Sequence, residues 1–308
     1  MQPHLFIGIP CYQDSESLQK TVQAIERTTA VPHELQVHVA KQSVVRNKND
    51  LLKKARASGA KYVCLCDDDV EPEKSWSEKL IDGIEEVHAR THRRVGQTSP
   101  LFIYPDGSIF CLWVNVTILI DLENVIIEAT AARSTVVDSH RAMLEAGALP
   151  GTLTIHTREF LDQIDWKFDE RYEKSQHEDI DQSLTCRSKG FMSLYNGHVT
   201  VIHHTQATSP RSGHENHQKL ISKWGHRADL SLSVQPHQGT IGQANQMLFT
   251  RSKNAWNLGR VVALLTKNPV QRIRTSVAIL RRAGIKGLIN QCRYKISDKS
   301  QFDHTDRK

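Results

Sequence analysis

Short apolar runs and amphipathic segments follow one another along the first hundred residues. Strands are predicted at residues 5–9, 35–40 and 61–66, where apolar side chains run continuously or alternate with polar ones. The segments between them, 15–28 and 47–58, carry apolar residues at helical spacing. Strands that alternate with helices in this way predict a doubly wound α/β sheet, whose ligands bind at the carboxyl ends of the strands.

Three adjacent carboxylates follow the most apolar of these strands. Asp67, Asp68 and Asp69 come directly after Cys66. Adjacent carboxylates repel one another, and a hard divalent cation that holds a diphosphate would neutralise them. The alternative is an acidic turn that caps a helix beginning near Pro72, where negative charge suits the helix dipole. The position at the end of a buried strand favours a ligand site.

Two later segments carry further candidate groups. Glu178 and Asp179 precede a predicted helix, and they are either helix-cap acids or the source of a general base. The strand predicted at 199–202 ends in His203 and His204. Because a neutral imidazole binds metals of the Mn²⁺ class, a histidine at a strand end is placed to complete a coordination shell that the aspartates begin.

Length and composition limit the class of protein. A chain of 308 residues is long enough to bury a sizeable core. Its longest apolar runs, such as 261–265, are far shorter than the roughly 18 to 20 residues of a membrane span, and the first residues do not match a signal peptide. We expect a cytoplasmic protein with free thiols, because its six cysteines lack metal-ligand spacing.

Charge is distributed unevenly along the chain. The formal net charge is +6, but residues 226–308 hold 15 Lys and Arg against 4 Asp and Glu, whereas residues 1–225 hold 25 against 30. The sequence therefore predicts a mildly acidic body and a strongly basic C-terminal extension. The apolar positions of the segment 270–282 follow helical spacing and are flanked by arginines. This basic amphipathic helix suits either an anionic membrane surface or the acidic surface of the body.

Several motifs together resemble those of one enzyme family. They are IGIPCY at 7–12, RNKN at 46–49, CDDDV at 66–70, FDE at 168–170, EDID at 178–181 and IH at 202–203. In this order and spacing, over residues 4–225, the sequence resembles the bacterial family 2 glycosyltransferases. The resemblance implies a GT-A fold, a Rossmann-like nucleotide-binding α/β/α sandwich with a mostly parallel central sheet. We expect a nucleotide-sugar half at 1–100, an acceptor half at 101–225 and a mainly helical extension at 226–308.

The resemblance also assigns site residues. It implies a metal site for Mn²⁺ or Mg²⁺ formed by Asp67, Asp69 and His203, with His203 preferred to His204. Asp68 would face the ribose or the sugar. The other donor contacts implied are Pro10 and Tyr12 against the nucleotide base and Arg46 near the ribose or diphosphate. Asp179 matches the general base, with Glu178 orienting it or the acceptor.

The activity implied is metal-dependent, inverting transfer of a hexose to a hydroxyl group. The expected donor is a UDP-linked sugar, and the expected acceptor is a glycan or a lipid-linked glycan in cell-surface polysaccharide synthesis. The basic extension would hold the enzyme on the inner face of the cell membrane, and a polar segment at 213–225 is expected to be a mobile flap over the donor.

Two alternatives remain. The family's usual Asp-rich turn after the second strand is missing after Val39, which leaves open a protein that binds nucleotide sugars without transferring them. Nucleic-acid binding through the basic extension is disfavoured, because no recognition motif accompanies the charge.

Overall fold

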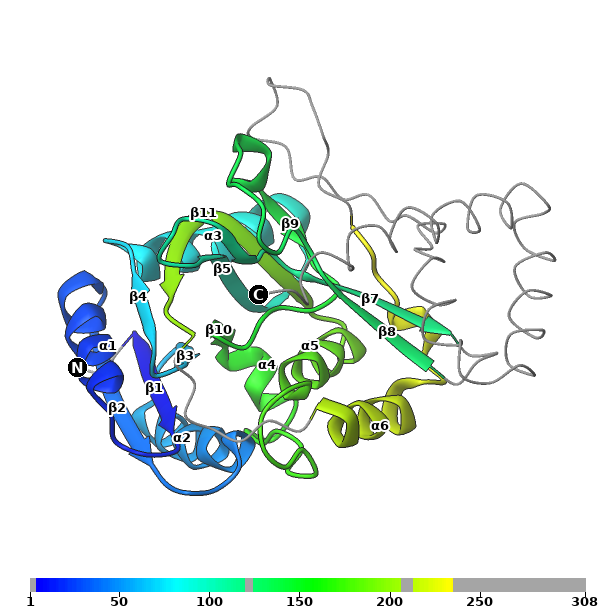
Figure 1. Cartoon of the computed structure of the whole chain (residues 1–308), viewed down its shortest axis with the longest axis horizontal. Helices are drawn as coiled ribbons and strands as arrows, with labels where there is room; N and C mark the ends of the chain where they lie inside the picture. The colour runs from blue at the N-terminus through cyan, green and yellow to red at the C-terminus, as the bar shows by residue number, and fades with distance from the viewer. Residues whose placement is uncertain (1–3, 120–123, 206–212, 235–308) are drawn as a thin grey trace, which may run out of the picture. The chain divides into compact units, whose positions relative to one another are not determined.

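The computed structural model describes residues 4–119, 124–205 and 213–234 (Figure 1). The basic extension beyond residue 234, with its expected amphipathic helix, lies outside the described residues. The strands of the main sheet are β1 (Leu5–Cys11), β2 (His33–Val39), β3 (Tyr62–Cys66), β4 (Val70–Pro72), β5 (Val95–Ile103), β6 (Ile109–Cys111), β9 (Met143–Glu145), β10 (Leu153–Thr157) and β11 (Met192–His203). The α-helices are α1 (Glu16–Thr28), α2 (Val44–Ser58), α3 (Trp76–Thr91), α4 (Arg158–Asp162), α5 (Glu178–Ser188) and α6 (Gly213–Trp224).

The main sheet has the strand order β2-β1-β3-β10-β5-β11-β4, with β6 paired to β5 and β9 to β11. Strands β1, β2, β3, β5 and β11 run in one direction, whereas β10 and β4 run in the opposite one. Because each crossover between parallel strands needs a long connection, helices separate the strands along the chain. The predicted doubly wound α/β sheet is confirmed.

Local sequence signals set the ends of the first helices. Ser15 caps α1 by accepting a hydrogen bond from the backbone N–H of Leu18, and Ser43 caps α2 in the same way. Gly59 ends α2 with φ 77°, a left-handed conformation that costs glycine little. The strand and helix predictions for the first 66 residues are therefore confirmed to within a few residues at each end.

Two apolar layers pack on opposite faces of the sheet. Along β1, Leu5, Ile7 and Ile9 belong to one core cluster, in which they pack with helices α1 and α3. Phe6 belongs to the other, in which α2, α4, α5 and α6 take part. This alternation follows from the period of two along a strand, and it explains why β1 is apolar throughout: both of its faces are buried.

Two expectations for local structure are wrong. Pro72 does not begin a helix, since residues 70–72 form β4, which pairs with β11, and α3 begins only at Trp76. The carboxylates Asp67 to Asp69 therefore do not cap a helix. Residues 213–225 were expected to be a polar flap, but α6 occupies this segment and buries Leu220 and Trp224.

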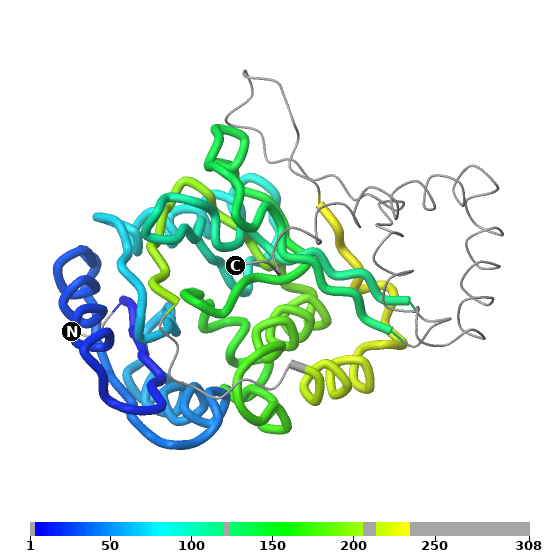
Figure 2. Tube along the Cα trace, viewed as in Figure 1, coloured from blue at the N-terminus to red at the C-terminus, as the bar shows by residue number. Residues whose placement is uncertain are grey.

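A second, two-stranded sheet lies outside the main one. It is the hairpin of β7 (Val114–Leu119) and β8 (Asn124–Ala129). Residues after α6 pack against it: Leu232 forms a bridge with Val116, and the indole N–H of Trp113 donates to the carbonyl of Val234. Figure 2 shows this yellow segment beside the hairpin. The first residues of the expected extension thus contact the body.

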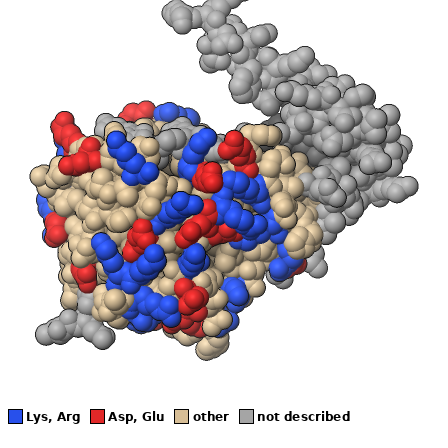
Figure 3. Space-filling model, turned by 90° about the horizontal axis from the view of Figure 1, so that it is seen from below, with Lys and Arg blue, Asp and Glu red and all other residues tan. Residues whose placement is uncertain are grey.

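The described surface mixes charges of both signs. On the face that Figure 3 shows, Lys and Arg side chains are interspersed with Asp and Glu. Exposed ion pairs of this kind, such as Lys61 with Glu85, add at most about 1 kcal/mol each. The five described cysteines are free and buried. Among the described helices, none combines the length and the apolar character that a membrane span requires.

Candidate functional site

One edge of the sheet collects the candidate residues. Because β1, β3 and β11 are parallel, their carboxyl ends meet at this edge, and Cys11, Asp67 and His203 stand at or just beyond them. Strand β10 runs the other way, so its first residue, Leu153, lies opposite Cys66 at the same edge. The edge is therefore lined by the ends of parallel strands and the beginning of an antiparallel one.

Three potential ligands for a cation lie together there. One ligand atom from each of Asp67, Asp69 and His203 lies within 4.8 Å of the others, and His203 Nε2 is 3.2 Å from Asp69 Oδ1. The ring of Phe110 packs edge-on against His203, with 4.5 Å between ring centroids. His204, by contrast, has its Nε2 3.7 Å from Glu71 Oε2. Of the two histidines, His203 is therefore the one grouped with the aspartates.

The electrostatics of this cluster suit a cation. Burial, and then the neighbouring charge of Asp69, raise the pKa of Asp67 to about 8, against the opposing charges of His203 and Lys48. A divalent cation stabilises the ionised carboxylates that burial disfavours. Two carboxylates and an imidazole form a donor set typical of Mn²⁺, so the residues present fit the expected metal.

The middle aspartate has a different partner. The thiol of Cys11 donates to Asp68 Oδ2 at 2.8 Å and also approaches the carbonyl of Gln13 at 2.7 Å. Burial, and then the hydrogen bond to Asp68, raise the pKa of Cys11 to about 12, so the thiol stays protonated as a donor. Asp68 is thus held toward the end of β1, while Asp67 and Asp69 share the cluster with His203.

One backbone segment, residues 151–152, links the candidate base to this cluster by hydrogen bonds. Asp179, in the first turn of α5, accepts hydrogen bonds from the backbone N–H of Gly151 at 3.2 Å and of Ile180 at 2.9 Å. At the next residue, the carbonyl of Thr152 accepts a hydrogen bond from the backbone N–H of Asp67 at 2.8 Å. Residues 151–152 therefore link the Asp179 carboxylate to the backbone of Asp67, although the two are more than a hundred residues apart in sequence.

Lys48 is a site residue that sequence reasoning missed. It is 2 % exposed, and its Nζ lies 3.6 Å from Glu178 Oε1. A Cβ on Gly151 would lie 3.4 Å from Lys48 Nζ and 3.0 Å from Asp179 Cβ, so glycine allows the three residues to approach closely. Its sequence signals were its place in the RNKN motif and its position near the start of a helix that follows a strand end.

Lys48 opposes the effect of burial on both acids. Burial raises the pKa of Glu178 and of Asp179, and in each case the positive charge of Lys48 is the main opposing influence. The ion pair with Glu178 is almost fully buried, so removing one partner would leave an uncompensated charge. Lys48 thus limits the rise that burial imposes on the pKa values of this carboxylate pair.

The remaining expected donor contacts are placed as follows. Pro10 lies in β1 opposite His38 and is buried, and Tyr12 follows that strand with a half-buried side chain. Arg46 is exposed on α2; the pKa of Glu170 is lowered chiefly by the hydrogen bond from Asn49, and the charge of Arg46 adds a smaller contribution. Two residues further along the same helix, Lys48 faces the carboxylates.

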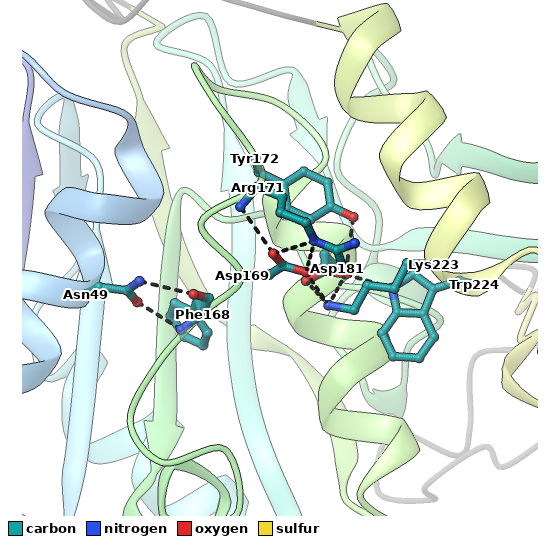
Figure 4. A network of polar contacts seen from close by, with 8 residues as sticks. All are labelled: Asn49, Phe168, Asp169, Arg171, Tyr172, Asp181, Lys223 and Trp224. Carbon is teal, nitrogen blue, oxygen red and sulfur yellow. Dashed lines mark hydrogen bonds and ion pairs between the residues drawn. The ribbon is translucent and has the colours of Figure 1, made fainter.

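A second group of acids forms a separate network, shown in Figure 4. Lys223 Nζ lies 2.9 Å from the carboxylates of both Asp169 and Asp181. Arg171 pairs with Asp169 at 2.6 Å, and the indole N–H of Trp224 donates to Asp181 at 2.7 Å. The FDE and EDID motifs thus contribute two carboxylates that are bound by the protein's own cations and donors.

The network has its own supports and a cavity beside it. Asn49 on α2 makes a pair of hydrogen bonds with the backbone of Phe168, at 3.0 and 2.8 Å. A cavity of about 740 Å³ opens here, away from Asp67. Its lining includes Ile164, Phe168, Asp169, Arg171, Asp181 and Lys223. Asp67, Asp69 and His203 do not line this cavity, and its charged groups Asp169, Arg171, Asp181 and Lys223 pair with one another.

Comparison with known proteins gives a fold but no sequence family. No protein-family model and no curated protein sequence match the chain. The structure of GalNAc-T7 with UDP, GalNAc and Mn²⁺ matches with a TM-score of 0.51 at 11% identity, over 73% of this chain and 48% of that chain. The protein has a GT-A-like fold. S. aureus TarS in complex with UDP-GlcNAc matches with a TM-score of 0.40 at 12% identity, over 69% of this chain and 60% of that one.

The GT-A-like fold confirms the expected fold class. The chain spans about half the length of the GalNAc-T7 structure it matches. At this level of identity the similarity extends to the architecture, while the assignment of each side chain rests on the geometry of this molecule. The acidic group at the strand ends, with the sequence Asp-Asp-Asp, is the feature of that geometry most directly linked to a metal.

Proposed function

We propose that the protein is a metal-dependent, inverting glycosyltransferase. The observation that carries the proposal is the grouping of Asp67, Asp69 and His203 beside Asp179 on a GT-A-like fold. A cation site alone suits many functions, and so does a buried carboxylate. Their connection through residues 151–152 supports pairing a proton acceptor with a metal site, the combination that sugar transfer from a nucleotide requires.

The residues have distinct roles in the proposed reaction. Asp67, Asp69 and His203 would hold Mn²⁺ or Mg²⁺, which when bound stabilises the negative charge that develops on a diphosphate leaving group. Asp179 accepts the proton of the acceptor hydroxyl as its oxygen attacks the anomeric carbon. Burial favours this step, because a raised pKa makes the carboxylate a stronger base. A single displacement inverts the anomeric configuration.

The finer assignments follow the sequence motifs and the charge. We propose a UDP-linked hexose as donor, because the motifs resemble family 2 glycosyltransferases and because the GalNAc-T7 structure contains UDP and Mn²⁺. Pro10, Tyr12, Arg46 and Asp68 are the proposed donor contacts. The proposed acceptor is a glycan or lipid-linked glycan of the cell surface, bound by residues 101–225.

The basic segment 226–308 supports the proposed location. Its net charge of +11 suits the inner, anionic face of the cell membrane. We propose that residues 1–225 form the catalytic domain, with 1–100 as the nucleotide-sugar half, and that the extension holds it at the membrane.

One observation favours a second candidate, a protein that binds nucleotide sugars without transferring them. The loop from β2 to α2 contains no acid: it runs from Ala40 to Ser43, which already caps α2. The two candidates predict the same ligand stabilisation and differ in turnover. Release of UDP that depends on an acceptor glycan excludes the binding-only candidate.

A thermal-shift screen tests the proposal. We expect Mn²⁺ together with a UDP-sugar to raise the melting temperature by several degrees, since a ligand at about 100 times its Kd adds about 2.7 kcal/mol. Asp69→Asn should abolish the shift. Asp138→Asn removes an exposed carboxylate elsewhere and serves as the control, with a shift like that of the parent. If no nucleotide sugar stabilises the parent in the presence of metal, the proposal fails.

A further inference from the structure

The turn before α5 is held by one side chain of α6. Asn216 is fully buried, and its amide Nδ2 lies 3.0 Å from the carbonyl oxygen of Glu173 and 2.8 Å from that of Gln176, with the Ser175 carbonyl at 3.5 Å. An amide nitrogen has two hydrogens to donate and carries no charge. Asn216 therefore donates hydrogen bonds to several backbone carbonyls of one turn and brings no charge into the protein interior.

The backbone of this turn needs such support. Lys174, Gln176 and His177 have φ values of 61°, 89° and 68°. Residues other than glycine adopt this left-handed region at a cost in energy, and they persist in it only where surrounding contacts hold them. The backbone carbonyl of His177 also accepts the hydrogen bond from Asp181 that begins α5. The conformation of the turn thus fixes where the helix starts.

The start of α5 carries the acids of the candidate site. Glu178 follows His177 directly, and Asp179 is the next residue. Both side chains contact residues outside α5. The Asp179 carboxylate accepts a hydrogen bond from the Gly151 N–H at 3.2 Å, and the Glu178 carboxylate lies 3.6 Å from Lys48 Nζ. A shift of the turn would move both carboxylates relative to these partners and to the cluster that contains Asp67.

Helix α6 is itself anchored at its other end. Lys223 and Trp224, two turns beyond Asn216, bind the carboxylate of Asp181 on α5. The helix therefore contacts the turn before α5 through Asn216 and the first turn of α5 through its last residues. With both ends held, Asn216 presents its amide to the turn from a fixed position.

We propose that Asn216 is a positioning residue for the reaction proposed above. By holding the carbonyls of residues 173–176, it sets the position of Asp179 relative to the acceptor hydroxyl and the metal-holding cluster. Asn216 does not touch the reacting atoms, so its removal lowers the rate of the chemical step and leaves the binding of metal and donor in place. The proposal rests on the glycosyltransferase function.

Two variants and one matched control test it. Asn216→Asp keeps the shape of the side chain but turns a donor toward carbonyls into an acceptor, and Asn216→Ala removes the group. Gln218→Ala changes an exposed position of the same helix and is the control. The measurements are kcat and donor KM, hydrogen exchange of the peptide that covers residues 173–181, and thermal shift with Mn²⁺ and UDP-sugar.

In both Asn216 variants we expect kcat to fall on the order of 10²-fold, as a misplacement of about 1 Å produces. Donor KM and the metal-dependent shift should stay close to those of the parent, and exchange of residues 173–181 should become about tenfold faster. Gln218→Ala should match the parent throughout. If Asn216→Asp fails to fold, Asn216→Ala decides.

Two results overturn the proposal. One is kcat like that of the parent in a folded Asn216 variant, even with a lowered melting temperature, because a purely structural role predicts this outcome. The other is unchanged exchange of residues 173–181. Failure of the glycosyltransferase function looks different: the parent itself then shows neither turnover nor donor-dependent stabilisation, while the exchange data still decide whether Asn216 holds the turn.

Discussion

Two groups of buried or half-buried carboxylates in this protein differ in what neutralises them. Asp169 and Asp181 lie within 2.9 Å of Lys223, and hydrogen bonds from Arg171 and Lys223 lower the pKa of Asp169. The Asp67 carboxylate forms no ion pair with a Lys or Arg among the described residues, and its pKa rises to about 8. The same residue type is thus structural where the protein supplies a cation, and it is suited to ligand binding where a cation must come from outside.

The largest effect expected from this comparison is a loss of turnover on replacing Asp179, the carboxylate linked to the strand-end cluster. Asp179→Asn should lower kcat by about 10² to 10⁴-fold, because an amide cannot take up the acceptor's proton. Donor and metal should still raise the melting temperature. The matched variant in the other group, Asp169→Asn, should keep kcat within a few-fold while lowering stability. An equal loss of turnover in both variants would contradict the division of roles.

Removing Lys223, the cation that pairs with Asp169 and Asp181, tests the comparison at the second group of carboxylates. Lys223→Met leaves Asp181 buried without its main counter-charge, so we expect a loss of about 3 kcal/mol in the free energy of unfolding. The double variant with Asp181→Asn should recover part of this loss. Chemical denaturation measures both. The stabilisation by Mn²⁺ should be unchanged, and its disappearance would show that the two groups are coupled.

The smallest effect concerns Lys48, the lysine paired with Glu178 next to Asp179. The charge of Lys48 lowers the pKa of Asp179, so Lys48→Met raises that pKa. Asp179 then needs a higher pH to lose its proton, and the acidic limb of the kcat/KM against pH profile moves to higher pH. Lys53→Met, at an exposed position of the same helix, should leave the profile in place. If the acidic limb of the profile stays at the same pH in both variants, Lys48 does not influence the pKa of the general base.

Sequence reasoning found the strands and helices whose signals are local. The apolar run of β3, the serine caps of α1 and α2 and Gly59 all act within a few residues, so they are visible without the rest of the fold. Strand β4 was missed because only three residues form it, and its pairing partner β11 lies more than a hundred residues away. The Glu-Pro sequence there also resembles the start of a helix.

The candidate site was predictable to the same extent. Asp67 and Asp69 follow β3 and His203 ends β11. Parallel strands bring their carboxyl ends together, so the grouping follows from the fold class. Lys48 and Asn216 could not be found in this way. Each lies on a helix, where periodicity tells which side is buried but not which group stands opposite. Asp169 and Asp181 resemble site residues in sequence, and only the position of Lys223 shows their structural role.

The reversed direction of β10 has a consequence for how such a site is studied. A strand that enters at this edge, rather than ending there, brings main-chain groups to it: the N–H of Gly151 and the carbonyl of Thr152. Replacing side chains one at a time by alanine leaves both main-chain groups in place. An alanine scan would therefore not identify the groups that set the spacing between Asp67 and Asp179. Replacement of single peptide bonds by esters, which removes one N–H at a time, would reveal it.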